Sequence, residues 1–136
     1  MTHYIYEVEV SDSAIDENGH VNNVEYVRWM QVAAMSHSET VGCTAATFAV
    51  GATWVVRSHH VDYLRPARAG DRIQVRTWIA DMRRAASLRR YEVIRADDSE
   101  LLAKGSTDWV LIDIGCGGPR SIPEAIRSMF EVVPDT

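Results

Sequence analysis

One short polar segment, placed just ahead of a predicted helix, concentrates side chains that are able to do chemistry. Asp16 supplies a carboxylate, His20 an imidazole, and Asn18 and Asn23 carry amides. Gly19 allows the chain to turn back, so that Asp16 could face the same space as the backbone N–H of Asn23. The segment therefore brings together an acid or base and a possible donor to a negatively charged oxygen.

The chemistry that suits this pair is acyl transfer to water. A helix start offers unpaired backbone N–H groups and a positive dipole end, which can bind an oxyanion. A nearby carboxylate activates the attacking group while the amide takes up charge on the carbonyl oxygen. Taken alone, the run from Asp16 to Gly19 is a common turn, and Asn22 or Asn23 is an ordinary helix cap. The joint spacing favours the catalytic interpretation, and Asn18 fits either one.

The helix behind this segment is predicted over residues 24–41. Asn22 is the expected N-cap, Glu25 three residues later completes a variant of the capping box, and Gly42 is a suitable left-handed terminator. Apolar residues recur at helical spacing, which predicts one buried stripe. Its members are Val27, Met30, Ala34 and Val41, with Val24 and Ala33 beside it.

The rest of the chain is rich in β-forming residues. The pattern predicts strands over 4–10, 44–64, 73–79, 88–94 and 101–114, with a short helix at 122–130. One strand, a long helix and then several longer strands favour an α+β fold, in which an antiparallel sheet packs against the helix.

Composition places limits on the function. The 136 residues are expected to form a single domain over 1–136, and the net charge of -5 argues against nucleic-acid binding. No signal peptide or membrane-spanning run is visible, so we expect a cytoplasmic protein without a membrane partner. Cys43 and Cys116 lack the spacing of metal ligands. His59 and His60 have no third ligand at a useful spacing. We therefore expect no metal and no cofactor.

The polar segment also resembles the active-site motif of a known family. The run D-x-N-x-H-V-N-N-x-x-Y-x-x-W, which begins at Asp16, is similar to the motif of plant acyl-acyl-carrier-protein thioesterases, and its spacing resembles the 4-hydroxybenzoyl-CoA thioesterase group. A second block, residues 60–67 followed by Gly70 and Asp71, is also similar. The resemblance implies a hotdog fold, in which an antiparallel sheet wraps around one long central helix. It implies hydrolysis of an acyl-CoA or acyl-carrier-protein thioester.

The resemblance also implies roles for individual residues. Asp16 is expected to be the general base or nucleophile, the Asn23 amide the oxyanion donor, and Asn18 and His20 members of the catalytic network. Gly19 and Tyr26 are expected to contact substrate. The family often has a second carboxylate in the loop where this chain has Ala14, and a further glutamate of the plant enzymes has no recognisable counterpart.

Relatives of this kind imply two further expectations. Basic residues at places similar to Arg83, Arg84 and Arg120 contact the phosphates of CoA, which suits the guanidinium group. A second subunit completes the pocket, so a homodimer or homotetramer is expected. The alternative function is a non-catalytic acyl-binding hotdog module, and a hotdog dehydratase is a third possibility, although the histidine and acidic pair that it needs are not recognisable.

Other candidates have simpler explanations. Glu39 sits near the far end of the helix, away from the proposed oxyanion site, and Cys43 follows that helix end, where the dipole disfavours a thiolate. We interpret Cys43 as a small structural residue. The tryptophans at positions 54, 78 and 109 are expected to pack in the core or at an interface, and some could line an acyl pocket.

Overall fold

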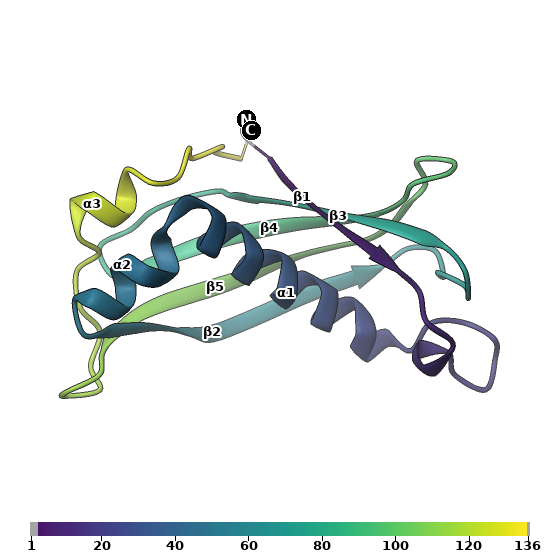
Figure 1. Ribbon diagram of the computed structural model, residues 1–136, viewed down its shortest axis with the longest axis horizontal. Coiled ribbons are helices and arrows are strands. Elements are labelled where there is room, and N and C mark those ends of the chain that lie inside the picture. Colours follow the sequence, from purple (N-terminus) through teal and green to yellow (C-terminus); the bar gives the residue numbers. More distant parts are fainter. Residues whose placement is uncertain (1–2, 136) are drawn as a thin grey trace.

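A five-stranded antiparallel sheet forms one layer of the molecule (Figure 1). The computed structural model describes residues 3–135. The strands are β1 (Tyr4–Glu9), β2 (Ala52–Tyr63), β3 (Arg72–Ile79), β4 (Ala86–Arg95) and β5 (Leu101–Asp113), in the spatial order β1-β3-β4-β5-β2. β1 and β2 are therefore the two edges of the sheet. The predicted antiparallel sheet is confirmed.

A long helix, α1 (Asn23–Val41), lies along one face of this sheet (Figure 1). The side chain of Asn22 accepts a hydrogen bond from the N–H of Val24 at 3.1 Å, so the predicted N-cap is confirmed. Gly42 ends the helix with φ of 90°, as expected of a left-handed terminator. The capping box is wrong, because Glu25 instead pairs with Arg28 and the Asn22 N–H donates to the Ala14 carbonyl.

The buried face of α1 differs in part from the predicted stripe. Met30, Ala33 and Ala34 are buried as predicted, but Val24 is 65% exposed. The large aromatic side chains of Tyr26 and Trp29 take up the space at the N-terminal end of the helix instead. The sheet therefore packs against a face that is rotated toward the aromatic residues.

A second helix, α2 (Cys43–Ala49), replaces the first part of the strand predicted over 44–64. The threonines and the phenylalanine of this segment favour a strand locally, but Cys43 and Thr47, spaced four residues apart, are both buried. Cys43 packs in a small core with Ile122 and Ile126. This tertiary packing outweighs local β-propensity, and β2 begins only at Ala52.

Elements near the C-terminus close the end of the sheet beside α2. The helix α3 (Glu124–Arg127) is shorter than the one predicted over 122–130. It lies beside α2, at the end of the molecule opposite the N-terminus of α1 (Figure 1). A short 3-10 helix (Asp12–Ala14) follows β1 at the other end. Among residues 3–135, no helix is long and apolar enough to span a membrane.

One glycine allows the sheet to approach α1 closely. A methyl group on Gly105 of β5 would come within 2.8 Å of the backbone oxygen of His60 and 3.1 Å of the Met30 side chain. We expect Gly105→Ala to lower the free energy of unfolding by about 1–3 kcal/mol, because backbone cannot move aside as a side-chain end can. Urea unfolding measures this. Gly118→Ala, whose methyl would meet Cys116 at an ordinary 3.7 Å, is the control; equal stability loss in both would contradict the steric explanation.

Candidate active site

The loop from Asp16 to His20 is a compact turn that holds the carboxylate in place. Oδ1 of Asp16 accepts hydrogen bonds from the backbone N–H groups of Asn18 at 2.9 Å and His20 at 3.2 Å. The Asp16 N–H donates to the His20 carbonyl at 2.7 Å, and Gly19 adopts φ of 76° between them. Within residues 3–135, Oδ2 of Asp16 receives no hydrogen bond, so one carboxylate oxygen is fixed and the other is unpaired.

The helix start faces the same space as this carboxylate. Asn23 is the first residue of α1, so its N–H has no acceptor within the helix, and none is found elsewhere in residues 3–135. The carbonyl of Asn23 accepts a hydrogen bond from the Tyr63 hydroxyl at 3.0 Å. Tyr63 thereby joins the end of β2 to the start of α1.

A cavity of about 230 Å³ lies between the loop, the helix start and the end of β2. Its lining includes Asp16, His20, Asn23 and Tyr26, four of the residues that the sequence predicts. Two other predicted residues lie outside this lining: Gly19 shapes the turn, and Asn18 is exposed and contributes its backbone N–H. Residues 63–66, at the end of β2 and just after it, complete the wall. The similar block at 60–67 contains them, and that resemblance was the only signal for them.

Tyr26 fixes the chain segment that forms this wall. It is 2% exposed, and its hydroxyl accepts a hydrogen bond from the N–H of Ala67 at 2.8 Å. Burial raises the pKa of Tyr26, so the hydroxyl stays neutral. The Tyr26 and Tyr63 rings meet edge to face, with centroids 5.2 Å apart. Helix and wall are therefore held in register by a buried contact.

We expect Tyr26→Phe to lower the free energy of unfolding by about 1–3 kcal/mol, because it leaves the buried N–H of Ala67 without an acceptor. Any activity that this cavity supports should fall as well, since the wall loses its tether. Chemical denaturation and an activity assay measure the two effects. Tyr6→Phe is the control, because that partly buried tyrosine makes no hydroxyl hydrogen bond among the described residues. Unchanged stability of Tyr26→Phe would contradict the role of this contact.

The three arginines predicted to contact CoA lie at the other end of α1. Arg127 of α3 donates to the carbonyl oxygens of Arg83 and Arg84, which places the β3–β4 turn beside α3 (Figure 1). The Arg83 guanidinium pairs with Asp81 and Asp108. Arg120 donates to the Val50 carbonyl at 2.7 Å and pairs with Asp113. A single chain therefore does not bring these arginines to Asp16.

The exposed side chain of Arg84 makes no hydrogen bond or ion pair among residues 3–135.

The described residues do not gather a set of metal ligands. Within residues 3–135, no group of three or more His, Cys, Asp or Glu side chains is placed to hold an ion. His59 instead hydrogen-bonds Thr107 at 2.7 Å, and His60 contacts Asp62.

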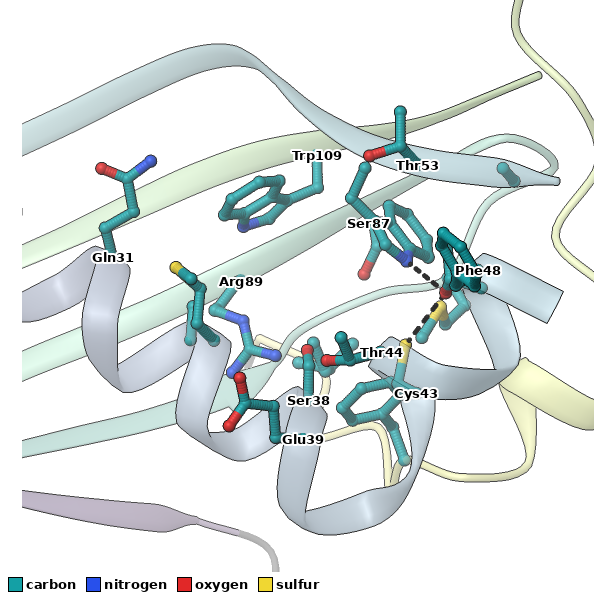
Figure 2. A pocket seen from close by; sticks show the side chains of 18 of the residues that line it. Gln31, Ser38, Glu39, Cys43, Thr44, Phe48, Thr53, Ser87, Arg89 and Trp109 are labelled. Atoms are coloured by element: carbon teal, nitrogen blue, oxygen red, sulfur yellow. Dashed lines mark hydrogen bonds between the residues drawn. The ribbon is translucent and has the colours of Figure 1, made fainter. Parts of the chain in front are cut away.

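A larger cavity, of about 440 Å³, lies between α1, α2 and the sheet (Figure 2). Trp54 and Trp109 line it, in agreement with the expectation that some tryptophans line a pocket, whereas Trp78 does not. Cys43 is buried at its floor with Sγ 3.6 Å from the Thr47 hydroxyl. Sequence reasoning did not identify this cavity, because its walls come from residues 31 to 130.

Comparison with known proteins identifies the fold and the family. The sequence profile of the thioesterase-like superfamily matches residues 9–130. The chain belongs to the thioesterase-like superfamily. The predicted enzyme class, thioesterase, is confirmed at that level.

Solved structures give the same fold. A 1,4-dihydroxy-2-naphthoyl-CoA thioesterase from Synechocystis superposes with a TM-score of 0.85 at 22% identity, covering 93% of this chain and 94% of that one. The probable thioesterase YbaW from Escherichia coli gives 0.86 at 17% identity, with 93% and 95% covered. A DHNA-CoA thioesterase from Staphylococcus aureus gives 0.80 at 24% identity, with 89% and 81% covered. The predicted hotdog fold is confirmed.

Proposed function

We propose that this thioesterase-like chain hydrolyses an acyl-CoA or acyl-carrier-protein thioester at the cavity that contains Asp16. The observation that carries the proposal is the pairing of a carboxylate that is fixed through one oxygen with a free helix-start N–H in one cavity. This pairing supports general-base or nucleophilic catalysis together with oxyanion stabilisation.

Two routes use the same groups. As a general base, Asp16 takes a proton from water, the hydroxide attacks the thioester carbonyl carbon, and the N–H of Asn23 stabilises the resulting oxyanion. The C–S bond then breaks, and the thiolate takes the proton back from Asp16. As a nucleophile, Asp16 displaces the thiolate to form an anhydride, which water hydrolyses. His20 lines the cavity, and in this proposal it positions the water.

Substrate identity is tested with a panel of acyl-CoA and acyl-carrier-protein thioesters, with release of free thiol as the readout. Hydrolysis of at least one class with a saturable rate supports the proposal. Acyl binding without thiol release across the whole panel would favour a non-catalytic acyl-binding module instead. A single turnover in ¹⁸O-labelled water tests for an anhydride that water attacks at the Asp16 carbonyl carbon. That attack leaves the label on Asp16 and delivers an unlabelled Asp16 oxygen to the product, whereas the general-base route puts the label in the product and none on the protein.

We propose further that two copies form the active unit through β2. This edge strand has twelve residues and, within residues 3–135, pairs with β5 alone. The backbone groups along its other side therefore have no strand partner in this part of the chain. Exposed apolar side chains continue this surface onto α1, where Met35 is 55% exposed and Val32 is 37% exposed. Exposed apolar patches of this kind mark interaction surfaces.

A two-fold arrangement about β2 would also explain where the arginines lie. The second copy runs in the opposite direction, so the end that carries Arg83, Arg84 and Arg120 approaches the Asp16 end of the first. The phosphates of CoA would then meet basic side chains from the partner. Of the three, Arg84 is the one whose guanidinium has no other partner among the described residues.

We expect Arg84→Ala to raise KM for acyl-CoA and leave kcat nearly unchanged, because a phosphate contact is the same in the ground state and the transition state. One lost contact with a charged group corresponds to a rise of roughly ten- to hundredfold. Steady-state kinetics measure it. The control is Arg72→Ala, which removes an exposed arginine from an ion pair with Asp97. An unchanged KM in Arg84→Ala would contradict the assignment.

A further inference from the structure

A buried arginine, with no acidic partner among residues 3–135, lines the larger cavity. Arg89 of β4 is only 2% exposed, and its side chain reaches from the sheet toward α1 (Figure 2). No carboxylate in residues 3–135 lies within the 4.0 Å that an ion pair needs. A guanidinium stays charged under all ordinary conditions, and a buried charge without a counter-charge is costly. An anionic group bound in the cavity would offset the free-energy cost of burying this charge.

The existing contacts of Arg89 orient it but do not neutralise it. Its Nη1 donates to Nδ1 of His37 at 2.9 Å and to the hydroxyl of Thr77 at 3.1 Å. The Phe130 ring lies 5.8 Å from the guanidinium carbon. Burial, and secondly the charge of Arg89, lowers the pKa of His37 to about 4, so the ring is neutral at pH 7 and accepts this hydrogen bond. Within the described residues, Nε and Nη2 make no hydrogen bond and keep their donors.

The rest of the cavity is mostly apolar. Ala34, Cys43 and Ala52 are buried at its floor, while Phe48 is 79% exposed and Ile114 is 57% exposed at its rim. Apart from Arg89, the lining contains one charged residue, Glu39, which is exposed on α1. The volume of about 440 Å³ falls in the range of cavities that hold small molecules. An apolar wall with a single buried cation selects a ligand with an apolar body and one anionic group.

We infer that the cavity between α1, α2 and the sheet binds an apolar carboxylate, with Arg89 pairing its carboxylate group. Carboxylate is the anion that suits the planar guanidinium, because two N–H groups meet two oxygens. Hydrolysis of a thioester releases an acid of this class, and an acyl chain that ends in a second carboxylate carries the same group. The inference concerns binding alone, so it does not depend on the chemistry proposed for Asp16.

Direct binding tests the inference on the full chain. Hexanoate, octanoate and decanoate are titrated by calorimetry, and octanamide serves as the neutral probe of the same shape as octanoate. We expect saturable binding of at least one carboxylate and affinity for octanamide that is lower by roughly ten- to hundredfold, the loss of a charge-assisted contact. Binding should also raise the pKa of His37, followed by NMR, because the carboxylate offsets the charge of Arg89.

Variants locate the site. Arg89→Met fills a similar space without charge, and it removes the cost of burying a charge that has no counter-charge. It should bind octanoate about as weakly as wild type binds octanamide. Arg89→Gln is the second variant if that one does not fold. Glu39→Gln should bind octanoate at least as tightly as wild type, because Glu39 is not the partner of Arg89. Asp16→Asn should bind octanoate unchanged, which separates this site from catalysis.

The source of the carboxylate follows from kinetics with matched CoA thioesters. One thioester has an acyl chain that ends in a carboxylate, and the other has a chain of the same length that ends in a methyl group. If Arg89→Met lowers kcat/KM only for the thioester that ends in a carboxylate, the acyl chain carries the group. If Arg89→Met hydrolyses both thioesters as wild type does, the free acid is the ligand. The inference is overturned if no carboxylate in the series binds saturably, if octanamide binds as tightly as octanoate, or if folded Arg89→Met binds octanoate with wild-type affinity.

Discussion

Asp16→Asn is expected to lose about a hundred- to ten-thousandfold in kcat on the best thioester substrate, the usual range for removing a general acid or base. Asparagine keeps an oxygen at the position of Oδ1, where Asp16 accepts the N–H groups of Asn18 and His20. The turn should therefore keep its shape, while the amide can neither take a proton from water nor attack a carbonyl carbon. Release of free thiol from the substrate panel measures the loss.

The matched control is Glu17→Gln, which removes the neighbouring carboxylate. Glu17 is exposed and lies outside the cavity lining, so its loss should leave kcat within about twofold of wild type, a change smaller than any assigned to general catalysis. Circular dichroism and thermal unfolding check that both variants are folded. If Asp16→Asn retains the wild-type kcat, Asp16 is not the catalytic group, whatever its position in the cavity.

Val56→Glu should separate the subunits of the proposed dimer and abolish hydrolysis with them. Val56 is 43% exposed on the free edge strand β2, and strand alternation puts it on the same face as Trp54, which lines the larger cavity. A charge buried without a partner at an interface costs roughly 3–5 kcal/mol, which weakens dimerisation about a hundred- to several thousandfold. Light scattering across a dilution series, paired with activity at each concentration, measures both effects.

Ile5→Glu makes the same change on the opposite edge of the sheet. Ile5 is 40% exposed on β1, so a dimer that forms through β2 should survive this substitution with its activity. Loss of the dimer in Ile5→Glu, but not in Val56→Glu, would show that the interface forms through β1 and not through β2. A wild-type protein that is monomeric at assay concentration and fully active would contradict the need for a second subunit.

The Asp16 turn was readable from sequence because its contacts are local. The hydrogen bonds that hold the carboxylate span two and four residues, and the N-cap of α1 spans two. Short-range contacts depend on residue types at fixed spacing, which a sequence displays directly. The location of the carboxylate at a helix start was therefore predictable, as were the helix and most of the strands.

Tertiary structure decided the features that depend on distant residues. The helix at Cys43–Ala49 forms because two of its residues are buried, one of them against the C-terminal segment, and this contact overrides the local preference for strand. The wall of the Asp16 cavity is held by a hydrogen bond between Tyr26 and Ala67, residues 41 positions apart. Sequence spacing contains no record of such contacts.

The environment of Arg89 is the feature that depends most on residues distant in sequence. In sequence it is one arginine beside another in a strand, and exposed strand arginines are common. The fold turns it inward, where it meets His37, 52 positions away in sequence, at the wall of a cavity whose lining spans most of the chain. The burial of Arg89 and its lack of an acidic partner among the described residues arise only when the helix packs over the sheet. The tertiary structure therefore decides that this arginine is a buried, unpaired charge.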